Sequence, residues 1–534
     1  MSKVKKKNTI ASQVMDARSV STPLIAIETP DPGATNSQLV NAIQATCKKA
    51  KAPLPPIFIW DSANYLRGVN NEALPVLNKL LEDFGGDPSA TAHPKEALSI
   101  LSKCPAGSFI IMANLQRFFE MPDIPTIQAV YNLRDAFKGS GRTLVMTMPH
   151  CSLPPELQHD VVVLTEKLPT TSDLKPIVKQ MHDSANWPQP NAEELDVAVS
   201  ALTGLANQQA EQTLAMAIVH GKDKEKLDLD TLRSQQRQQV EQTPGLSIYD
   251  GRENFNDLIG MDALTKGFMR NVIKSKNKPR AFVFLDEMEK MMAGALGGGS
   301  DSSGTSQEQM GYLLQHMQDT EAKGIILVGI GGTGKSALAK ACGNEGNCWT
   351  VNLDLGSMKG SLVGETGAMT REAFKVVDSL GQGSAFYVGT CNQINAMPPE
   401  LRRRFNYGTW YIDLPNKDAL LAMWKHYTAL FGVENKTDFK SEGWTGAEVK
   451  TCCMMASDMG LSLKEASRFI SPVCRSSWET LQSLRELATG RFLCATNGGF
   501  YRQPTDDHRV EHLNRHDDGL IEQVGGRLMT MDES

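Results

Sequence analysis

Short apolar runs alternate with amphipathic segments in the first part of the chain. Four runs rich in β-branched and aromatic residues predict buried strands. They cover residues 56–61, 108–112, 143–147 and 160–164. Between them, apolar positions at helical spacing predict helices over 71–82 and 127–137. Strands that alternate with helices are typical of a parallel α/β sheet.

A second series of apolar runs begins near Ile248 and predicts another α/β domain. Its expected strands cover residues 281–285, 325–328, 350–353, 385–390 and 409–412. After Pro415 the pattern is helical to about residue 490. The expected divisions are a flexible N-terminal arm (1–50), an α/β domain (51–171), a helical subdomain and linker (172–247), a second α/β domain (248–415), a helical region (416–490) and a polar tail (491–534).

Composition sets broad limits on the class of protein. The 534 residues include 41% hydrophobic and 22% charged residues, as in ordinary soluble globular proteins. The net charge of −6 provides no overall basic field that would attract nucleic acid. No apolar run reaches the roughly 20 residues that a bilayer requires, so no membrane association is expected. The ten cysteines contain no C-x-x-C pair, which favours a reduced, cytoplasmic location.

Residues 329–336, with the sequence GIGGTGKS, match the phosphate-loop pattern G-x-x-x-x-G-K-[ST]. A strand-like run precedes them and a helix start follows, which is the context that this motif requires. Backbone N–H groups of such a loop close around phosphate oxygens, while its lysine and hydroxyl serve the β and γ phosphates and Mg²⁺. The expected ligands are therefore ATP and Mg²⁺. The expected contact residues are Gly329, Gly331, Gly332, Thr333, Gly334, Lys335, Ser336 and Ala337.

Two carboxylates, Asp286 and Glu287, end the apolar strand at 281–285. Beside a phosphate loop, Asp286 would join Ser336 as a ligand of Mg²⁺, and Glu287 would be the general base for the attacking water. The alternative is a helix N-terminus with acidic residues in its first turn. Asn392, after the strand at 385–390, would orient the same water through its amide, or else occupy a turn.

Three arginines follow one another at 402–404. Guanidinium groups stabilise charge on a transferring phosphoryl group, and a neighbouring subunit often supplies them. The alternative is a basic surface patch.

These motifs resemble those of the AAA+ ATPases, and more narrowly the AAA proteins of the hypothetical chloroplast reading-frame (Ycf) family. The matching segments are 255–261, 285–290, 329–336, 360–365, 390–392, 398–405 and 443–448. The resemblance implies an α/β fold with a three-layer P-loop AAA+ parallel sheet and a C-terminal helical lid. It also implies a ring, commonly a hexamer, with ATP between subunits.

The resemblance assigns further roles to single residues. Ile259 and Gly260 would lie near the adenine, and Gly446 and Ala447 would begin the lid helix that faces the nucleotide. Arg403 and Arg404 fall in the arginine-finger position. Residues 362–364 occupy the central-pore loop, where many protein-threading relatives carry an aromatic residue and this chain has leucine. A glycine-bounded loop without a pore role is the alternative.

The order of the motifs departs from that family. Relatives run from Walker A to Walker B and then sensor 1, whereas here Walker B (Asp286 and Glu287) precedes Walker A (Lys335). Residues 281–324 are exchanged with 325–384. Either the chain is a true permutation that keeps the spatial order of strands, or it is a rearrangement that folds poorly. The sequence leaves both interpretations open.

The first half of the chain echoes the second. Residues 108–117 parallel 281–290, but Ala113 and Asn114 replace the two carboxylates. Residues 153–157 parallel 397–401, without the arginines that follow. No phosphate loop precedes this first copy. We therefore predict that a degenerate AAA+-like α/β domain, unable to hydrolyse ATP, precedes the active one.

Three functions are compatible with these features. The leading hypothesis is an ATP-hydrolysing homo-oligomeric ring that remodels an unidentified protein or complex. The second is a nucleotide-dependent switch or scaffold with little turnover. The third is a nucleic-acid motor, which the acidic net charge disfavours and only the basic stretch 274–280 supports.

Overall fold

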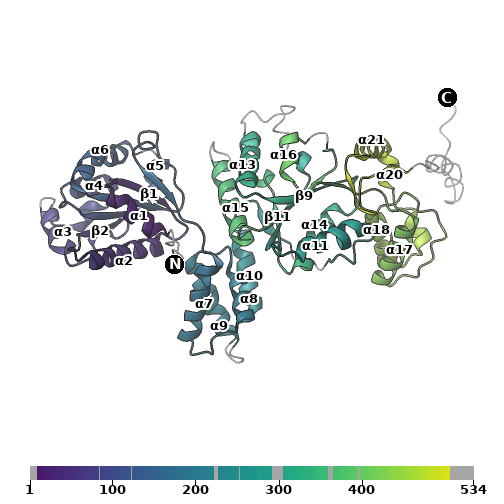
Figure 1. The fold of residues 1–534 in the computed structure, drawn as a ribbon, viewed down its shortest axis with the longest axis horizontal. Coiled ribbons are helices and arrows are strands. Elements are labelled where there is room, and N and C mark those ends of the chain that lie inside the picture. Colours follow the sequence, from purple (N-terminus) through teal and green to yellow (C-terminus); the bar gives the residue numbers. More distant parts are fainter. Residues whose placement is uncertain are drawn as a thin grey trace, which may run out of the picture. The chain divides into compact units, whose positions relative to one another are not determined.

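The computed structural model describes residues 9–82, 85–121, 123–221, 226–249, 251, 253–290, 305–358, 365–394 and 397–504. The chain divides into two compact units, Met1–Gln236 and Arg237–Ser534 (Figure 1). No helix within the described ranges combines the length and the apolar character needed to cross a membrane.

The first unit is built on a six-stranded sheet with the order β3-β2-β4-β5-β1-β6. The strands are β1 (Leu24–Glu28), β2 (Ile57–Asp61), β3 (Tyr65–Gly68), β4 (Phe109–Ala113), β5 (Thr143–Met148) and β6 (Val162–Thr165). β3 pairs antiparallel with β2, and the other neighbours are parallel. The expected strands of this part correspond to β2, β4, β5 and β6.

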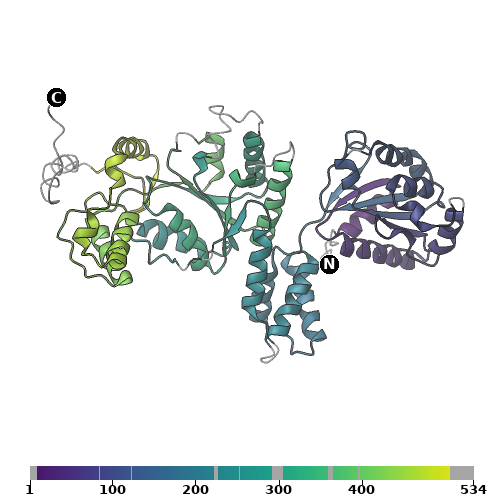
Figure 2. The same ribbon diagram turned by 180° about the vertical axis from the view of Figure 1, so that it is seen from behind.

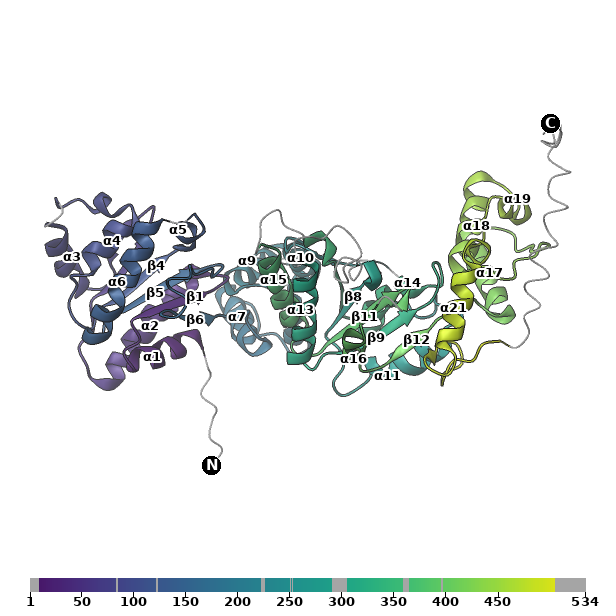
Figure 3. The ribbon, with the colours of Figure 1, turned by 90° about the horizontal axis from the view of Figure 1, so that it is seen from above.

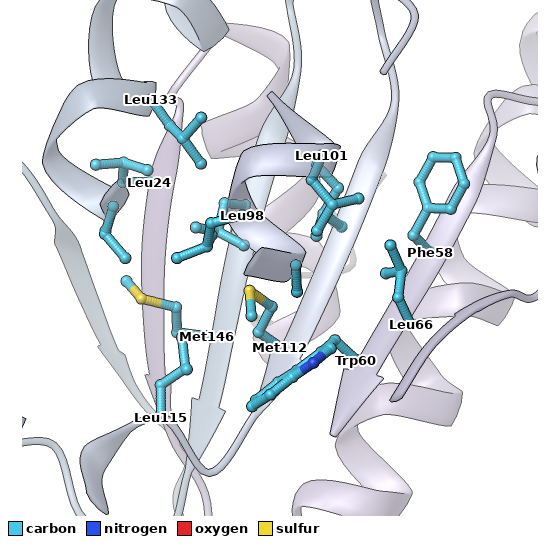
Figure 4. Packing of buried hydrophobic residues seen from close by; sticks show 14 of the residues in the cluster. Leu24, Phe58, Trp60, Leu66, Leu98, Leu101, Met112, Leu115, Leu133 and Met146 are labelled. Carbon is cyan, nitrogen blue, oxygen red and sulfur yellow. The ribbon is translucent and has the colours of Figure 1, made fainter. Parts of the chain in front are cut away.

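Helices cover both faces of this sheet. They are α1 (Ile10–Ser19), α2 (Pro32–Ala50), α3 (Ala73–Glu82), α4 (Pro94–Leu101), α5 (Gln116–Glu120) and α6 (Ile124–Ser140). Successive side chains of a strand point to opposite faces. Leu24 of β1 accordingly joins the core beneath α3, α4 and α6, whereas Ile25 joins the core beneath α1 and α2. Figure 4 shows Leu98 and Leu133 packing over Leu24 and Met146.

Residues 9–50 are not the flexible arm that the sequence analysis expected. They form α1, β1 and α2, and β1 is an interior strand between β5 and β6. All four residues from Leu24 to Ile27 are fully buried. This run is only four residues long and lies between prolines in a polar context, so its strand signal is weak.

Four helices follow β6, and the last of them extends past Gln236: α7 (Thr171–Ser184), α8 (Ala192–Leu202), α9 (Asn207–His220) and α10 (Leu229–Glu241) (Figure 2). Leucine, valine and alanine side chains from all four form one apolar cluster. Gln236, from the Gln-rich stretch, is fully buried and donates to the carbonyl oxygen of Thr203 at 2.6 Å. One of the polar residues of α10 therefore lies inside the helical bundle and bonds to its backbone.

The second unit contains a seven-stranded sheet with the order β13-β12-β9-β11-β8-β10-β7. The strands are β7 (Leu246–Ile248), β8 (Ala281–Leu285), β9 (Lys323–Val328), β10 (Trp349–Leu353), β11 (Ala385–Cys391), β12 (Thr409–Tyr411) and β13 (Leu493–Cys494). β7 pairs antiparallel with β10, and the other neighbours are parallel. The result is the parallel-dominated α/β sheet that the sequence predicts.

The exchanged segments occupy the positions that the family resemblance requires. The Walker A strand β9 lies beside the sensor strand β11, and the Walker B strand β8 lies between β11 and β10. Two connections each pass a strand: β8 leads through α13 (Thr305–Asp319) to β9, and β10 leads through α15 (Glu365–Gly381) to β11. α14 (Lys335–Gly346) packs against the core on the face lined by Phe282 and Ile325. The spatial strand order is therefore that of the first interpretation, a permutation.

The two sheets share one strand order. Read from β6 and from β12, they run β6-β1-β5-β4-β2-β3 and β12-β9-β11-β8-β10-β7. β4 therefore corresponds to β8, as the echo between residues 108–117 and 281–290 predicts. β1 corresponds to the Walker A strand β9. The counterpart of the Walker A strand in the first unit therefore lies within residues 1–50, the segment expected to be a flexible arm.

The helical region after β12 contains α17 (Lys417–Phe431), α18 (Gly446–Met459), α19 (Leu463–Ser467), α20 (Val473–Ser476) and α21 (Trp478–Ala488). In Figure 3, α17 and α18 lie together with α19 in one group, with α21 next to them. Trp424, Trp444 and Cys453 are among the buried residues of its core. This is the expected lid.

The chain after the lid is folded as far as the structure describes it. β13 pairs with β12, and the Cys494 N–H donates to the carbonyl oxygen of Gly499 at 2.8 Å in the turn that follows. Phe492, Ala495 and Tyr501 are buried. Residues 491–504 are thus not part of a loose polar tail, because three apolar side chains anchor them.

Exchanging residues 281–322 with 323–384 would place Walker A before Walker B and leave β9 uncut. The exchange joins chain segments at the edge where β8, β9 and β11 begin, and there Ala385 pairs with Ala281 and Phe386 with Lys323. Because only the loops change, we expect the reordered chain to unfold cooperatively within about 4 °C of the original. Thermal unfolding followed by circular dichroism tests this, and a broad, non-cooperative transition would contradict it.

Candidate nucleotide-binding site

The phosphate loop joins the end of β9 to the start of α14. Two of its glycines have left-handed backbones, with φ of +80° at Gly332 and +94° at Gly334. A Cβ atom on Gly332 would lie 2.8 Å from Thr445 Oγ1, and one on Gly334 would lie 2.7 Å from Met261 Cε. Both positions therefore favour glycine for conformation, and Gly332 also for space, whereas the flexible end of Met261 could move away from a Cβ at Gly334. Such a loop turns backbone N–H groups towards an anion at the start of a helix.

Lys335 is folded into this loop. Its Nζ donates to the carbonyl oxygens of Gly329 and Ile330, each at 2.7 Å, and only 7% of the residue is exposed. Burial lowers the pKa of Lys335 to about 8, although the nearby Glu289 and Asp286 carboxylates favour the charged form. An ammonium group held by loop carbonyls can pass its hydrogen bonds to phosphate oxygens, so the residues present fit a nucleotide.

Ser336 and Asp286 meet although 50 residues separate them in sequence. Ser336 Oγ donates to Asp286 Oδ1 at 3.2 Å. A hydroxyl and a carboxylate are the ligands that Mg²⁺ takes beside a phosphate loop. In the described part of the chain, no cluster of three or more histidine, cysteine, aspartate or glutamate residues offers another metal site. The structure thus brings together the two residues expected to hold magnesium.

Glu287 follows Asp286 in an uncommon backbone conformation. Its φ is +46°, and its N–H donates to Thr390 Oγ1 at 2.9 Å. The carboxylate forms an ion pair with Lys290 Nζ at 2.5 Å and is 43% exposed. A non-glycine residue in the left-handed region often marks a functional site, and here it is the expected general base.

Asn392 binds a residue that the sequence analysis did not single out. Its backbone N–H and its side-chain Nδ2 donate to Glu289 Oε1 at 3.1 and 2.8 Å. Because Glu289 accepts from the amide nitrogen of Asn392, the amide oxygen is the side-chain atom that could accept a hydrogen bond from water. A third carboxylate two residues after Glu287 was the only available signal for Glu289.

The nucleotide-facing part of the lid touches the phosphate loop directly. The Ala447 N–H donates to the carbonyl oxygen of Gly332 at 3.3 Å, at the start of α18, which begins at Gly446. Ile259 packs against the lid core, and a Cβ on Gly260 would lie 3.3 Å from Ala419 Cβ. The structure thus brings Ile259 and Gly260, the residues expected near the adenine, close to the lid, whose helix α18 begins at Gly446 and Ala447 as expected.

The folded segment after the lid, residues 492–501, reaches the same place. Thr496 Oγ1 donates to the carbonyl oxygen of Gly260 at 2.8 Å, and the Ala263 N–H donates to the carbonyl oxygen of Thr496 at 3.3 Å. This contact was missed because the segment reads as polar and the two residues are 236 positions apart. Its buried aromatic residues were the available signal.

A buried ion pair lies where the lid leaves the core. Arg485, only 1% exposed, places Nε 3.0 Å from Asp413 Oδ1, and the Tyr501 hydroxyl donates to Asp413 Oδ2 at 2.7 Å. Asp413 follows β12 and Arg485 belongs to α21. The core, the lid and residues 492–501 are therefore joined through one carboxylate.

The arginine cluster is separate from this assembly. Arg404 Nη2 donates to Gln318 Oε1 at 2.7 Å, and Arg403 is exposed. Neither forms a hydrogen bond or an ion pair with the phosphate loop among the described residues. The expected pore loop, residues 362–364, lies outside the described ranges.

The chain is similar to known proteins that are all described as AAA proteins. A family model for the N-terminal domain of SpoVK-like AAA ATPases matches residues 12–166, which span α1 to β6. The chain is 23% identical over 434 residues to the uncharacterized AAA domain-containing protein ycf46 of Guillardia theta, covering 74% of this chain and 75% of the relative. It is 22% identical over 447 residues to ycf46 of Trieres chinensis, covering 74% and 79%. For ycf46 of Pyropia yezoensis the identity is 21% over 343 residues, covering 57% and 62%.

Replacing Gly332 by alanine should destabilise the fold. Strain at φ +80° and the contact with Thr445 predict a loss of about 1–3 kcal/mol in the free energy of unfolding. Gly331→Ala is the matched control, because a Cβ there has nothing within 4 Å, and we expect a change within about 0.5 kcal/mol. Urea denaturation without nucleotide measures both. Equal losses in the two variants would contradict the described geometry.

Binding of Mg²⁺-ATP should take up protons at pH 8. With a pKa of about 8, free Lys335 is partly neutral there, and phosphate contacts favour its charged form. Uptake should vanish near pH 6.5, where Lys335 is already charged. Calorimetry in two buffers of different ionisation enthalpy measures the uptake, and Lys340→Arg on the same helix should retain it. Equal uptake at the two pH values would contradict the depressed pKa.

Proposed function

This chain belongs to the AAA+ ATPases of the ycf46 type, and on that premise we propose that it binds ATP with Mg²⁺ and hydrolyses the γ-phosphate. The observation that carries the proposal is the hydrogen bond between Ser336 and Asp286 beside the buried Lys335. The two partners of this hydrogen bond, the phosphate loop and the Asp286 carboxylate, lie next to each other, although their order in the chain is exchanged.

The residues have distinct proposed roles. Lys335 and the loop N–H groups would bind the β and γ phosphates, and Ser336 and Asp286 would hold Mg²⁺, which would supply positive charge to the phosphate oxygens as ADP leaves. Glu287 accepts a proton from the attacking water. Asn392, fixed on Glu289, orients that water through its amide oxygen. Gly260, Gly446 and Ala447 line the adenine side.

We further propose that the chain acts as a homo-oligomeric ring that remodels a protein or a protein complex. Arg403 is exposed and Arg404 lies next to it on a short helix, α16 (Pro399–Arg404). Their lack of bonds to the chain's own phosphate loop, among the described residues, agrees with a role at the site of a neighbouring copy. A hexamer is the expected size from the family.

Glu287→Gln should bind ATP but hydrolyse it at least about a hundredfold more slowly than the wild type, because the amide cannot accept the proton. Phosphate release and nucleotide binding are measured with Mg²⁺, and light scattering of the variant with ATP reports the mass of the assembly. Glu479→Gln, an exposed position in α21, is the control and should retain wild-type turnover.

A wild-type protein that neither binds nor hydrolyses ATP would overturn the enzyme proposal. Binding with negligible turnover would instead favour the switch or scaffold. The ion pair of Glu287 with Lys290 supports the switch or scaffold, because it engages the carboxylate that is proposed to accept the proton from water.

A role with nucleic acid also has one specific observation in its favour. A cavity of about 240 Å³ at the edge where β9 and β11 begin is lined by Phe268, Phe386 and Tyr407 together with Lys323. The exposed basic stretch 274–280 borders it, with Asn277 and Pro279 in its lining. Aromatic and basic side chains together suit single-stranded nucleic acid. Stimulation of turnover more than about tenfold by single-stranded DNA or RNA would favour this candidate over protein remodelling.

A further inference from the structure

Thr390 bonds to both residues of the proposed Walker B pair, to the side chain of Asp286 and to the backbone of Glu287. It lies near the end of β11, is 1% exposed, and donates its hydroxyl hydrogen to Asp286 Oδ1 at 2.5 Å. The same hydroxyl oxygen accepts the backbone N–H of Glu287 at 2.9 Å. A threonine hydroxyl offers one donor and two acceptor positions, so both bonds can exist at once.

The position of Thr390 follows from strand register. β11 and β8 are parallel neighbours with Gly389 opposite Leu285, so the next residue on each strand brings Thr390 opposite Asp286. Asp286 Oδ1 then lies between two hydroxyl donors, Thr390 and Ser336. These bonds fix the plane of the carboxylate before any metal arrives.

The bond to the Glu287 N–H has a separate consequence. Glu287 adopts a φ of +46°, which a glutamate rarely does without compensation. The Glu287 N–H donates to Thr390 Oγ1 at 2.9 Å and to Asp286 Oδ1 at 3.1 Å, so the Thr390 hydroxyl provides the shorter of its two hydrogen bonds. The turn that aims Glu287 away from the strand is therefore held from the neighbouring strand.

The first unit contains a related arrangement without the carboxylates, in which the Asn114 N–H donates to the backbone carbonyl oxygen of Thr147 at 2.9 Å rather than to its hydroxyl. Thr147 of β5 lies opposite Ala113 of β4, and Asn114 then has a φ of +61°. The Thr147 side-chain oxygen is buried and has no hydrogen-bond partner among the described residues. Where the aspartate is missing, the equivalent threonine hydroxyl forms no hydrogen bond within the described part of the chain. The sheet alone therefore does not require a bonded hydroxyl at this position, which indicates that the hydroxyl of Thr390 serves Asp286.

We propose that Thr390 is a positioning residue that sets the orientation of the metal-binding Asp286 and the backbone turn of the general base Glu287. The inference rests on the proposed ATPase function. In this proposal Thr390 acts through Asp286 and Glu287, the two residues to which it bonds. Its effect should appear in the response to Mg²⁺ and in kcat, with little change in metal-free nucleotide binding.

The test compares three variants of the full chain. Thr390→Val keeps the shape and loses the hydroxyl, and Thr390→Ser keeps the hydroxyl. Thr370→Val is the control, because Thr370 is also fully buried and donates its hydroxyl to the carbonyl oxygen of Thr366 in α15. Thermal unfolding of the two valine variants reports any general loss of stability, and Thr390→Ala replaces Thr390→Val if the latter does not fold.

We expect Thr390→Val to lower kcat about tenfold or more, and to raise the Mg²⁺ concentration for half-maximal activity several-fold. Its affinity for ATP in EDTA should stay within about twofold of the wild type. Thr390→Ser should stay within about threefold of the wild-type kcat, and Thr370→Val should show the wild-type response to Mg²⁺. A Thr390→Val protein with wild-type kcat and Mg²⁺ response, or with no larger effect than Thr370→Val, would overturn the inference.

The inference and the proposed function can fail separately. If the wild type binds ATP but does not turn it over, the gain in ATP affinity on adding Mg²⁺ becomes the readout. A smaller gain in Thr390→Val than in the wild type then supports positioning of Asp286, and an equal gain overturns it.

Discussion

The pairing of β11 with β9 on one side and β8 on the other is the interaction on which the candidate site depends. Parallel strands that pair in register end at the same edge of a sheet, so the residues after each strand become neighbours. Through these two ladders, the phosphate loop after β9 and the carboxylates after β8 converge at the end of β11. The order in which the chain visits the strands has no direct influence on that convergence.

This dependence explains how an exchange of long segments can leave a site intact. The helices α13 and α15 pack against each other and cross the sheet between strands that are not adjacent. The contacts within the sheet depend on which strands are neighbours, because side chains pack on the strand faces and backbone hydrogen bonds form along the strand edges. Chemistry that is assembled from strand ends is thus more tolerant of topology than of register.

The sequence predicted the local parts of this protein well. The phosphate loop, Asp286 and Ser336 carry signatures within a few residues, and the structure brings them together. β1 was missed because its apolar run is short and lies in a polar context. Glu289 and Thr496 were missed for a different reason: their partners Asn392 and Gly260 are 103 and 236 positions away, so only the folded chain reveals their contacts.

The segment after the lid changes how the lid can be described mechanically. The chain leaves the core sheet at β12, forms the lid helices, and returns to pair β13 with the same β12. Asp413 at the exit is bonded both to Arg485 of the lid and to Tyr501 of the returning segment. The lid is therefore anchored to the core sheet at both its N-terminal and its C-terminal end. These two attachments, both next to β12, restrict the movements that the lid can make relative to the core sheet.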